Sequence, residues 1–114
     1  MGDLSQHFSR REFDCKDGSP ANPHPKLIDR LETLRAIVGK PLRIVSGYRS
    51  PAYNRKVGGA KASQHLKNRA ADIPSGYATL EQARQAGFTG IGYSGLWATH
   101  VDVREGRRAT WRYR

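Results

Sequence analysis

The chain has 114 residues and a formal net charge of +10, from 20 Lys and Arg against 10 Asp and Glu. Its length fits a single domain over residues 1–114 and excludes a second core of similar size. Its single cysteine, Cys15, excludes an intramolecular disulfide and a paired-thiolate zinc site, so any metal ligands must be His and carboxylate side chains.

The first half of the chain predicts a long helix followed by a strand. Apolar residues recur at helical spacing over residues 25–38, with proline in the first turn and glycine after the last. Residues 42–46 then predict a short strand, which leads through a glycine into a polar turn at residues 48–51. Functional residues are often found on loops that follow such strands.

The second half predicts shorter elements. Helices are expected at residues 52–57 and 80–86, and strands at residues 69–73, 90–93, 99–103 and 110–113. Thr79 can cap the second of these helices. The fold class is therefore α+β, with a small, mainly antiparallel sheet and two main helices.

Two of the four histidines have the surroundings of functional residues. His7 and His24, near the amino terminus, are more readily explained as surface or capping residues. His100 lies in a segment whose period-two alternation places two valines on one face, and His100 with Asp102 on the other. The polar pair would face a cleft, although an exposed sheet face explains the same pattern. His65 is the remaining candidate.

Asp72 lies among apolar residues of the strand predicted at residues 69–73. A carboxylate in such a place is costly unless it pairs with a cation or a metal. An ion pair with arginine is one explanation. Two imidazoles and one carboxylate are also a common zinc tripod, which leaves a fourth position for water. Zinc lowers the pKa of that water toward about 7 and so supplies a hydroxide nucleophile.

Three segments occur together in the order of a known family. They read SGYRS at residues 46–50, SQHLKNRAAD at residues 63–72 and HVD at residues 100–102. They resemble the S-G-Y-R-S segment, the S-x-H-x-x-G-x-A-x-D signature and the downstream histidine strand of the zinc D-alanyl-D-alanine peptidases. This family is similar to the hedgehog signalling domain and to lysostaphin-type enzymes. The resemblance spans most of the chain and implies the same hedgehog-like zinc fold.

The resemblance also implies roles for individual residues. The implied Zn²⁺ ligands are His65, Asp72 and His100. Arg49 is the implied catalytic cation, because its planar fork can bind the substrate's carboxylate or polarised carbonyl with two hydrogen bonds. Tyr48 and Ser63 are the neighbouring residues expected to bind substrate.

Two positions depart from the family pattern. The glycine expected three residues after the first histidine is Asn68, which adopts positive φ with modest strain. The acidic general base that many members have three residues before the last histidine is Trp97. Asp102 is then our candidate base, and an acceptor that orients His100 is its alternative role. Trp97 is expected either to form an apolar wall of the substrate groove or to belong to the core.

These observations favour an enzyme over two alternatives. We expect a monomeric, zinc-dependent carboxypeptidase or endopeptidase that cleaves peptidoglycan stem peptides or cross-links, held on the anionic cell wall by its positive charge. One alternative is a non-catalytic, zinc-stabilised wall-binding module. The other is a basic nucleic-acid-binding protein, which the charge suggests but no recognised motif supports, so no specific nucleic acid is expected.

Targeting signals bear on where the protein acts. No stretch approaches the roughly 18 apolar residues of a membrane-spanning helix, and the first twenty residues lack the apolar core of a secretion signal. We therefore expect a chain without a transmembrane segment or signal peptide, made in the cytoplasm. It would act on the cell wall after phage lysis, as an endolysin, or after delivery by a particle.

Overall fold

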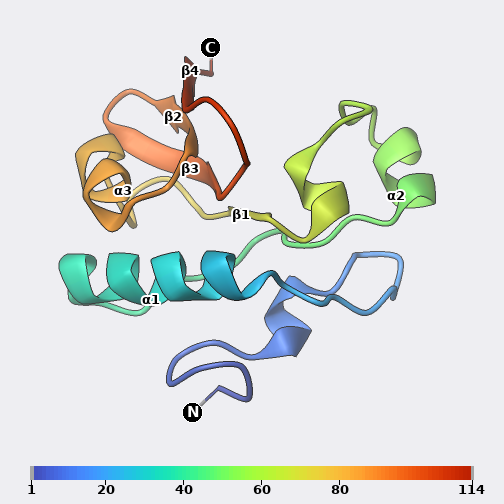
Figure 1. Cartoon of the computed structure of the whole chain (residues 1–114), viewed down its shortest axis with the longest axis horizontal. Coiled ribbons are helices and arrows are strands. Elements are labelled where there is room, and N and C mark those ends of the chain that lie inside the picture. Colours follow the sequence, from blue (N-terminus) through green and yellow to red (C-terminus); the bar gives the residue numbers. More distant parts are fainter. Residues whose placement is uncertain (1, 114) are drawn as a thin grey trace.

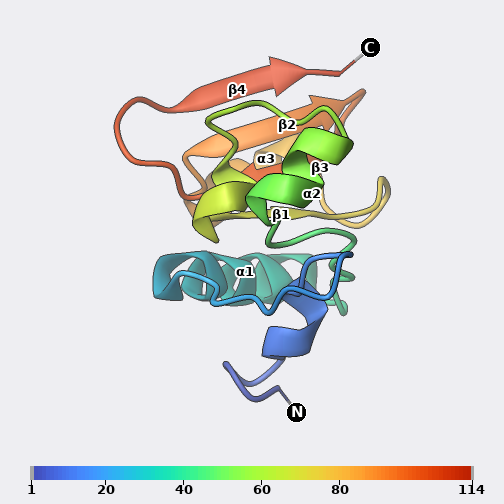
Figure 2. The ribbon, with the colours of Figure 1, turned by 90° about the vertical axis from the view of Figure 1, so that its right-hand side faces the viewer.

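A small sheet and a long helix form the two main layers of the fold (Figures 1 and 2). The computed structural model describes residues 2–113. The sheet has the order β1-β3-β2-β4 and contains β1 (Ala70–Asp72), β2 (Gly90–Ser94), β3 (Trp97–Asp102) and β4 (Ala109–Arg112). β3 is antiparallel to both of its neighbours, whereas β4 runs parallel to β2. The prediction of an α+β fold is confirmed.

The predicted helices are confirmed as α1 (Pro25–Val38), α2 (Pro51–Lys56) and α3 (Leu80–Ala86). Their ends follow local signals. His24 caps α1, where its Nδ1 accepts a hydrogen bond from the Lys26 amide at 3.1 Å, as expected of a capping histidine. The hydroxyl of Thr79 accepts from the third residue of α3 in the same way.

The strand predicted at residues 42–46 is wrong. These residues make one isolated antiparallel bridge, in which the Asp72 amide donates to the Ser46 carbonyl at 2.7 Å and the Val45 amide donates to the Asp72 carbonyl at 2.8 Å. β1 is only three residues long, so its free edge offers too few partners for a longer ladder. The bridge still ties the segment before Arg49 to the sheet.

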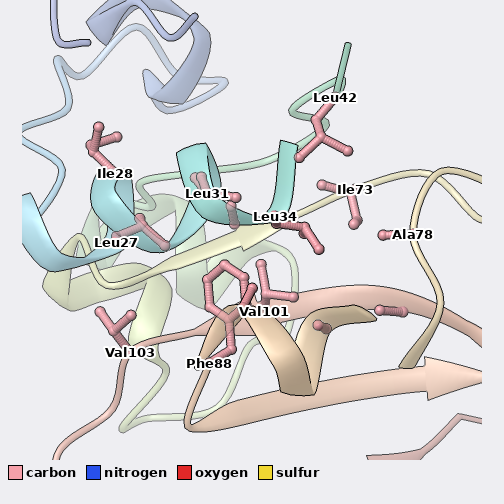
Figure 3. Close-up of a cluster of buried hydrophobic side chains, with 14 of the residues drawn as sticks. Leu27, Ile28, Leu31, Leu34, Leu42, Ile73, Ala78, Phe88, Val101 and Val103 are labelled. Atoms are coloured by element: carbon pink, nitrogen blue, oxygen red, sulfur yellow. The ribbon is translucent and has the colours of Figure 1, made fainter. Parts of the chain in front are cut away.

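The hydrophobic core lies between α1 and one face of the sheet (Figure 3). α1 buries a stripe of four residues at helical spacing, Leu27, Ile28, Leu31 and Leu34. The sheet contributes Ile91 and Val101, and α3 adds two alanines. Within the described residues, no helix combines the length and apolar character needed to cross a membrane.

The amino-terminal segment lies on the side of α1 away from the sheet and supports the loop that carries Arg49 (Figures 1 and 2). Phe13 is buried, and its carbonyl accepts a hydrogen bond from the Tyr48 amide at 2.7 Å. A Cβ at Gly47 would lie 2.7 Å from the Phe13 Cα, so this contact requires glycine. Cys15 is also buried, and His7 pairs with Glu32 on α1 at 2.6 Å.

Candidate metal centre

Strand register brings distant residues into one row across the sheet. Successive partners from β1 to β4 are Asp72, His100, Gly92 and Trp111. Because side chains alternate along a strand, this row lies on the face opposite the core residues Ile91 and Val101. A second row on the same face, two residues along each strand, contains Ala70, Asp102, Gly90 and Ala109. The candidate site is built on these two rows.

His65 reaches this face from outside the sheet, on the 3₁₀ helix η2 (Gln64–Lys67). The Ser63 hydroxyl accepts a hydrogen bond from the His65 amide at 3.2 Å and so caps the helix. Asn68 ends it in the left-handed conformation, with φ of 59°. This is the positive φ expected where the family pattern has glycine. The turn allows the chain to enter β1 directly, which places His65 over Asp72.

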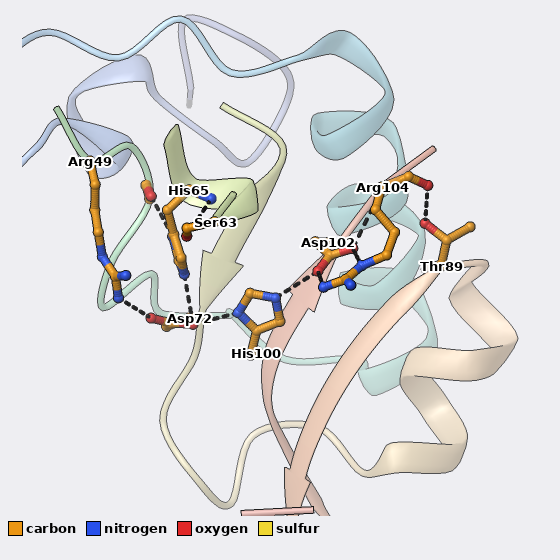
Figure 4. Close-up of polar contacts among 9 residues, drawn as sticks. Arg49, Ser63, His65, Asp72, Thr89, His100, Asp102 and Arg104 are labelled. Carbon is orange, nitrogen blue, oxygen red and sulfur yellow. Dashed lines mark hydrogen bonds and ion pairs between the residues drawn. The ribbon is translucent and has the colours of Figure 1, made fainter. Parts of the chain in front are cut away.

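The three predicted ligands converge around one carboxylate oxygen (Figure 4). Asp72 Oδ1 lies 3.3 Å from His65 Nε2 and 3.0 Å from His100 Nδ1. One ligand atom from each residue lies within 4.8 Å of the other two. His65 is only 3% exposed and His100 only 7%, so the protein holds both rings firmly. This cluster has the size and composition of a metal site.

The outer nitrogen of each imidazole has its own acceptor. His65 Nδ1 donates to the Gly47 carbonyl at 2.6 Å, and His100 Nε2 donates to Asp102 Oδ2 at 2.7 Å (Figure 4). These acceptors hold the protons on the outer nitrogens and leave the lone pairs of the inner nitrogens facing Asp72. Two neutral imidazoles and a carboxylate in this arrangement fit Zn²⁺, with room for a further ligand.

Asp72 is prepared to act as an anion. Burial by itself would raise the pKa of its carboxyl, but when His100 and His65 carry protons on the nitrogens that face Asp72, their hydrogen bonds and charges outweigh burial and hold that pKa well below its usual range. Arg49 contributes from the open side, with Nη2 3.8 Å from Asp72 Oδ2. An ionised carboxylate at neutral pH is the form that binds a metal cation.

Asp102 lies behind His100 rather than in the open part of the site. Its side chain is fully buried, and Arg104 donates to both carboxylate oxygens, from Nε at 2.9 Å and from Nη2 at 2.6 Å (Figure 4). Burial would raise its pKa, but the hydrogen bonds from His100 and Arg104 lower it to about 2. A Cβ at Gly90 would lie 2.1 Å from Asp102 Oδ1, so the carboxylate needs glycine beside it on β2. This position matches the predicted alternative role, an acceptor that orients His100.

A pocket of about 300 Å³ opens over the three candidate ligands. Besides them, its polar and aromatic lining consists of Arg49, Ser63, Gln64, Arg104, Trp111 and Tyr113. Arg49 is steadied by Asn54 of α2. The Nη1 of Arg49 donates to Asn54 Oδ1 at 3.4 Å, and the side-chain Nδ2 of Asn54 donates to the Ala60 carbonyl at 2.9 Å. The structure thus brings Arg49 and Ser63 to the place predicted for substrate.

Two predicted substrate residues lie elsewhere. Tyr48 is partly buried and packs against the hydrophobic core, and it does not line the pocket. Trp97 lies at the opposite end of β3 from Asp102 and lines a separate hollow with Val38 and Tyr77. It therefore forms no wall of the pocket over the candidate ligands.

Comparisons with known proteins agree with this geometry. A family model described as peptidase M15 matches residues 4–102, a range that includes His65, Asp72 and His100. The zinc D-Ala-D-Ala carboxypeptidase of Streptomyces albus G is 39% identical over an alignment of 87 residues, and the match covers 68% of this chain and 34% of that relative. The chain thus spans about a third of the length of the relative. On the match to most of its length, the chain belongs to the peptidase M15 family.

Proposed function

We propose that this protein is a zinc peptidase that hydrolyses a peptide bond in bacterial peptidoglycan. The observation that carries the proposal is the convergence of His65, Asp72 and His100, with the outer nitrogen of each imidazole held by an acceptor. Zn²⁺ bound there would polarise a carbonyl and lower the pKa of water toward about 7. The similarity to a zinc D-Ala-D-Ala carboxypeptidase supports both the metal and the substrate class.

Arg49 is proposed to bind the oxygen on which negative charge develops during hydrolysis. Its guanidinium lines the pocket beside Asp72, and the contact with Asn54 keeps it there. A planar guanidinium can offer two N–H donors to one oxyanion, and pre-positioned donors of this kind lower the barrier of acyl transfer. Peptidoglycan stem peptides also carry free carboxylates, which the same cation would attract.

Asp102 is proposed to position His100 and not to act as the general base. Its Oδ1 accepts from the Arg104 amide and Nε, and its Oδ2 accepts from His100 and from Arg104 Nη2. Both oxygens are therefore occupied, and no part of the side chain is exposed to the pocket. A general base must reach the proton that it removes, directly or through one water.

The Asp102→Asn variant tests this role. Asparagine places an NH₂ group or a weaker acceptor against His100 and leaves Arg104 without its carboxylate, so the zinc dissociation constant should rise by about 10- to 100-fold. A competition titration against a chromophoric chelator measures it. Glu105→Gln is a matched control, because Glu105 is an exposed acid three residues further along, in the loop that follows β3. Unchanged zinc affinity with a large loss of turnover, and loss of the acidic limb of the pH profile, would instead support the general-base role.

The direct test of the function is digestion of isolated peptidoglycan. Purified protein with zinc is expected to release new amino groups, and mass spectrometry of the products distinguishes a carboxypeptidase, which frees terminal D-alanine, from an endopeptidase. Moderate salt should lower activity on intact wall far more than on a short soluble stem peptide, because salt screens the attraction between the +10 chain and the anionic wall. No cleavage by a folded, zinc-loaded protein would favour the non-catalytic wall-binding module.

A further inference from the structure

The pocket has an aromatic side that the proposed chemistry does not use. Trp111 lies on β4 and Tyr113 directly follows its last residue, and both side chains line the pocket. The Trp111 ring centre lies 5.1 Å from that of His100 and 6.3 Å from that of Tyr113. Tyr113 is 45% exposed, so much of this surface is available to a ligand.

The glycine at position 92 allows these rings to lie over the sheet. A Cβ there would lie 2.6 Å from Tyr113 Cε2 and 2.7 Å from Trp111 Nε1. Gly92 is the cross-strand partner of both His100 and Trp111, so its backbone lies between the two residues in the sheet and no side chain keeps their rings apart. Because β2 has no side chain at this point, the two rings extend across its backbone as far as the pocket.

The aromatic surface is apolar although an arginine packs on it. The Arg104 Cζ lies 4.9 Å from the centre of the Trp111 ring. The Nε and Nη2 groups of Arg104 are both committed to Asp102, and this ion pair neutralises the guanidinium charge. Arg104 therefore holds the indole in place and provides little attraction for a second anion.

From this arrangement we infer that Trp111 and Tyr113 form a subsite for the uncharged, aliphatic side of the substrate residue next to the scissile bond. The inference rests on the proposed function. Arg49 lies beside Asp72 at one side of the candidate ligands, and Trp111 lies beside His100 at the other. A peptide whose reacting carbonyl points toward Arg49 then extends its neighbouring residue along the aromatic pair. Large, rigid rings bind an aliphatic group at a low cost in side-chain entropy.

Kinetics on a short soluble stem peptide test the subsite. We expect a roughly tenfold higher KM, with kcat within about twofold of wild type, in each of three variants: Trp111→Leu, Tyr113→Leu and Gly92→Ala. The reason is that the rings contact the substrate equally in the ground state and in the transition state, so their loss weakens binding without slowing the chemical step. Gly92→Ala retains both rings and only displaces them. Zinc content should stay unchanged in all three variants. Tyr77→Leu is the matched control, because Tyr77 is a similarly exposed tyrosine that lines the separate hollow, and its KM should stay at the wild-type value.

Other outcomes would overturn the inference. If KM is unchanged in Tyr113→Leu and Gly92→Ala, while Trp111→Leu loses zinc or kcat, then Trp111 only packs against His100 and the subsite does not exist. If the wild-type protein cleaves no peptide, the proposed function fails, and peptide binding then tests the subsite by itself. In Trp97→Phe protein the one remaining tryptophan is Trp111. A stem peptide should shift its fluorescence, with weaker binding after Tyr113→Leu, and no shift would contradict the subsite.

Discussion

Replacing His65 and His100 together by alanine is expected to remove zinc from the protein and to abolish cleavage of peptidoglycan. Asp72 would then be the last of the three candidate ligands, and one carboxylate does not hold zinc in a structural or catalytic site. Elemental analysis of protein purified without chelator should find about one zinc per chain in the wild type and none in the variant. The release of amino groups from isolated peptidoglycan measures the activity of the same two proteins.

The other two histidines provide the control. His7 pairs with Glu32 and His24 caps α1, both away from the pocket over the candidate ligands. The His7→Ala, His24→Ala double variant should retain zinc and activity, at a modest cost in stability from the lost cap. Wild-type zinc content in the His65→Ala, His100→Ala variant would contradict the ligand assignment. Circular dichroism of each variant confirms that the comparison is between folded proteins.

The Arg49→Lys variant is expected to lose about a hundredfold in kcat/KM while its zinc content stays unchanged. Lysine retains the positive charge near Asp72 but has no planar fork, so it cannot give two hydrogen bonds to the developing oxyanion. It also loses the fixed contact with Asn54 Oδ1 that steadies the guanidinium. Steady-state kinetics on a soluble stem peptide, together with zinc analysis of the same preparation, measure both quantities.

Arg55→Lys is the matched control, because Arg55 is an exposed arginine on α2, next to the loop that carries Arg49. Its kinetics should equal those of the wild type. A wild-type rate for Arg49→Lys would mean that Arg49 does not contact the reacting group. A loss of zinc in Arg49→Lys would instead mean that Arg49 acts through Asp72, whose Oδ2 lies 3.8 Å from its Nη2.

Local patterns in the sequence were sufficient for the helices, and the resemblance to a known family indicated the candidate metal ligands. The stripe of apolar residues on α1, its proline start and its glycine end are signals within a single segment, and segments of this kind can be interpreted without knowledge of their partners. The motif around His65 and Asp72 is equally local, since Asn68 adopts the positive φ that joins η2 to β1. The strand predicted at residues 42–46 failed because a strand exists only where a neighbour offers enough hydrogen-bonding partners.

Tertiary structure alone decided the surroundings of these ligands. In the sequence Asp102 simply shares a strand face with His100, and only burial and the contacts with Arg104 show that it lies behind the imidazole. Trp111 and Tyr113 lie in the strand predicted at residues 110–113, but nothing in the sequence specifies that β4 pairs with β2 in the register that places Trp111 opposite Gly92. Strand register depends on packing across the whole sheet, so the aromatic side of the pocket appears only when the chain is folded.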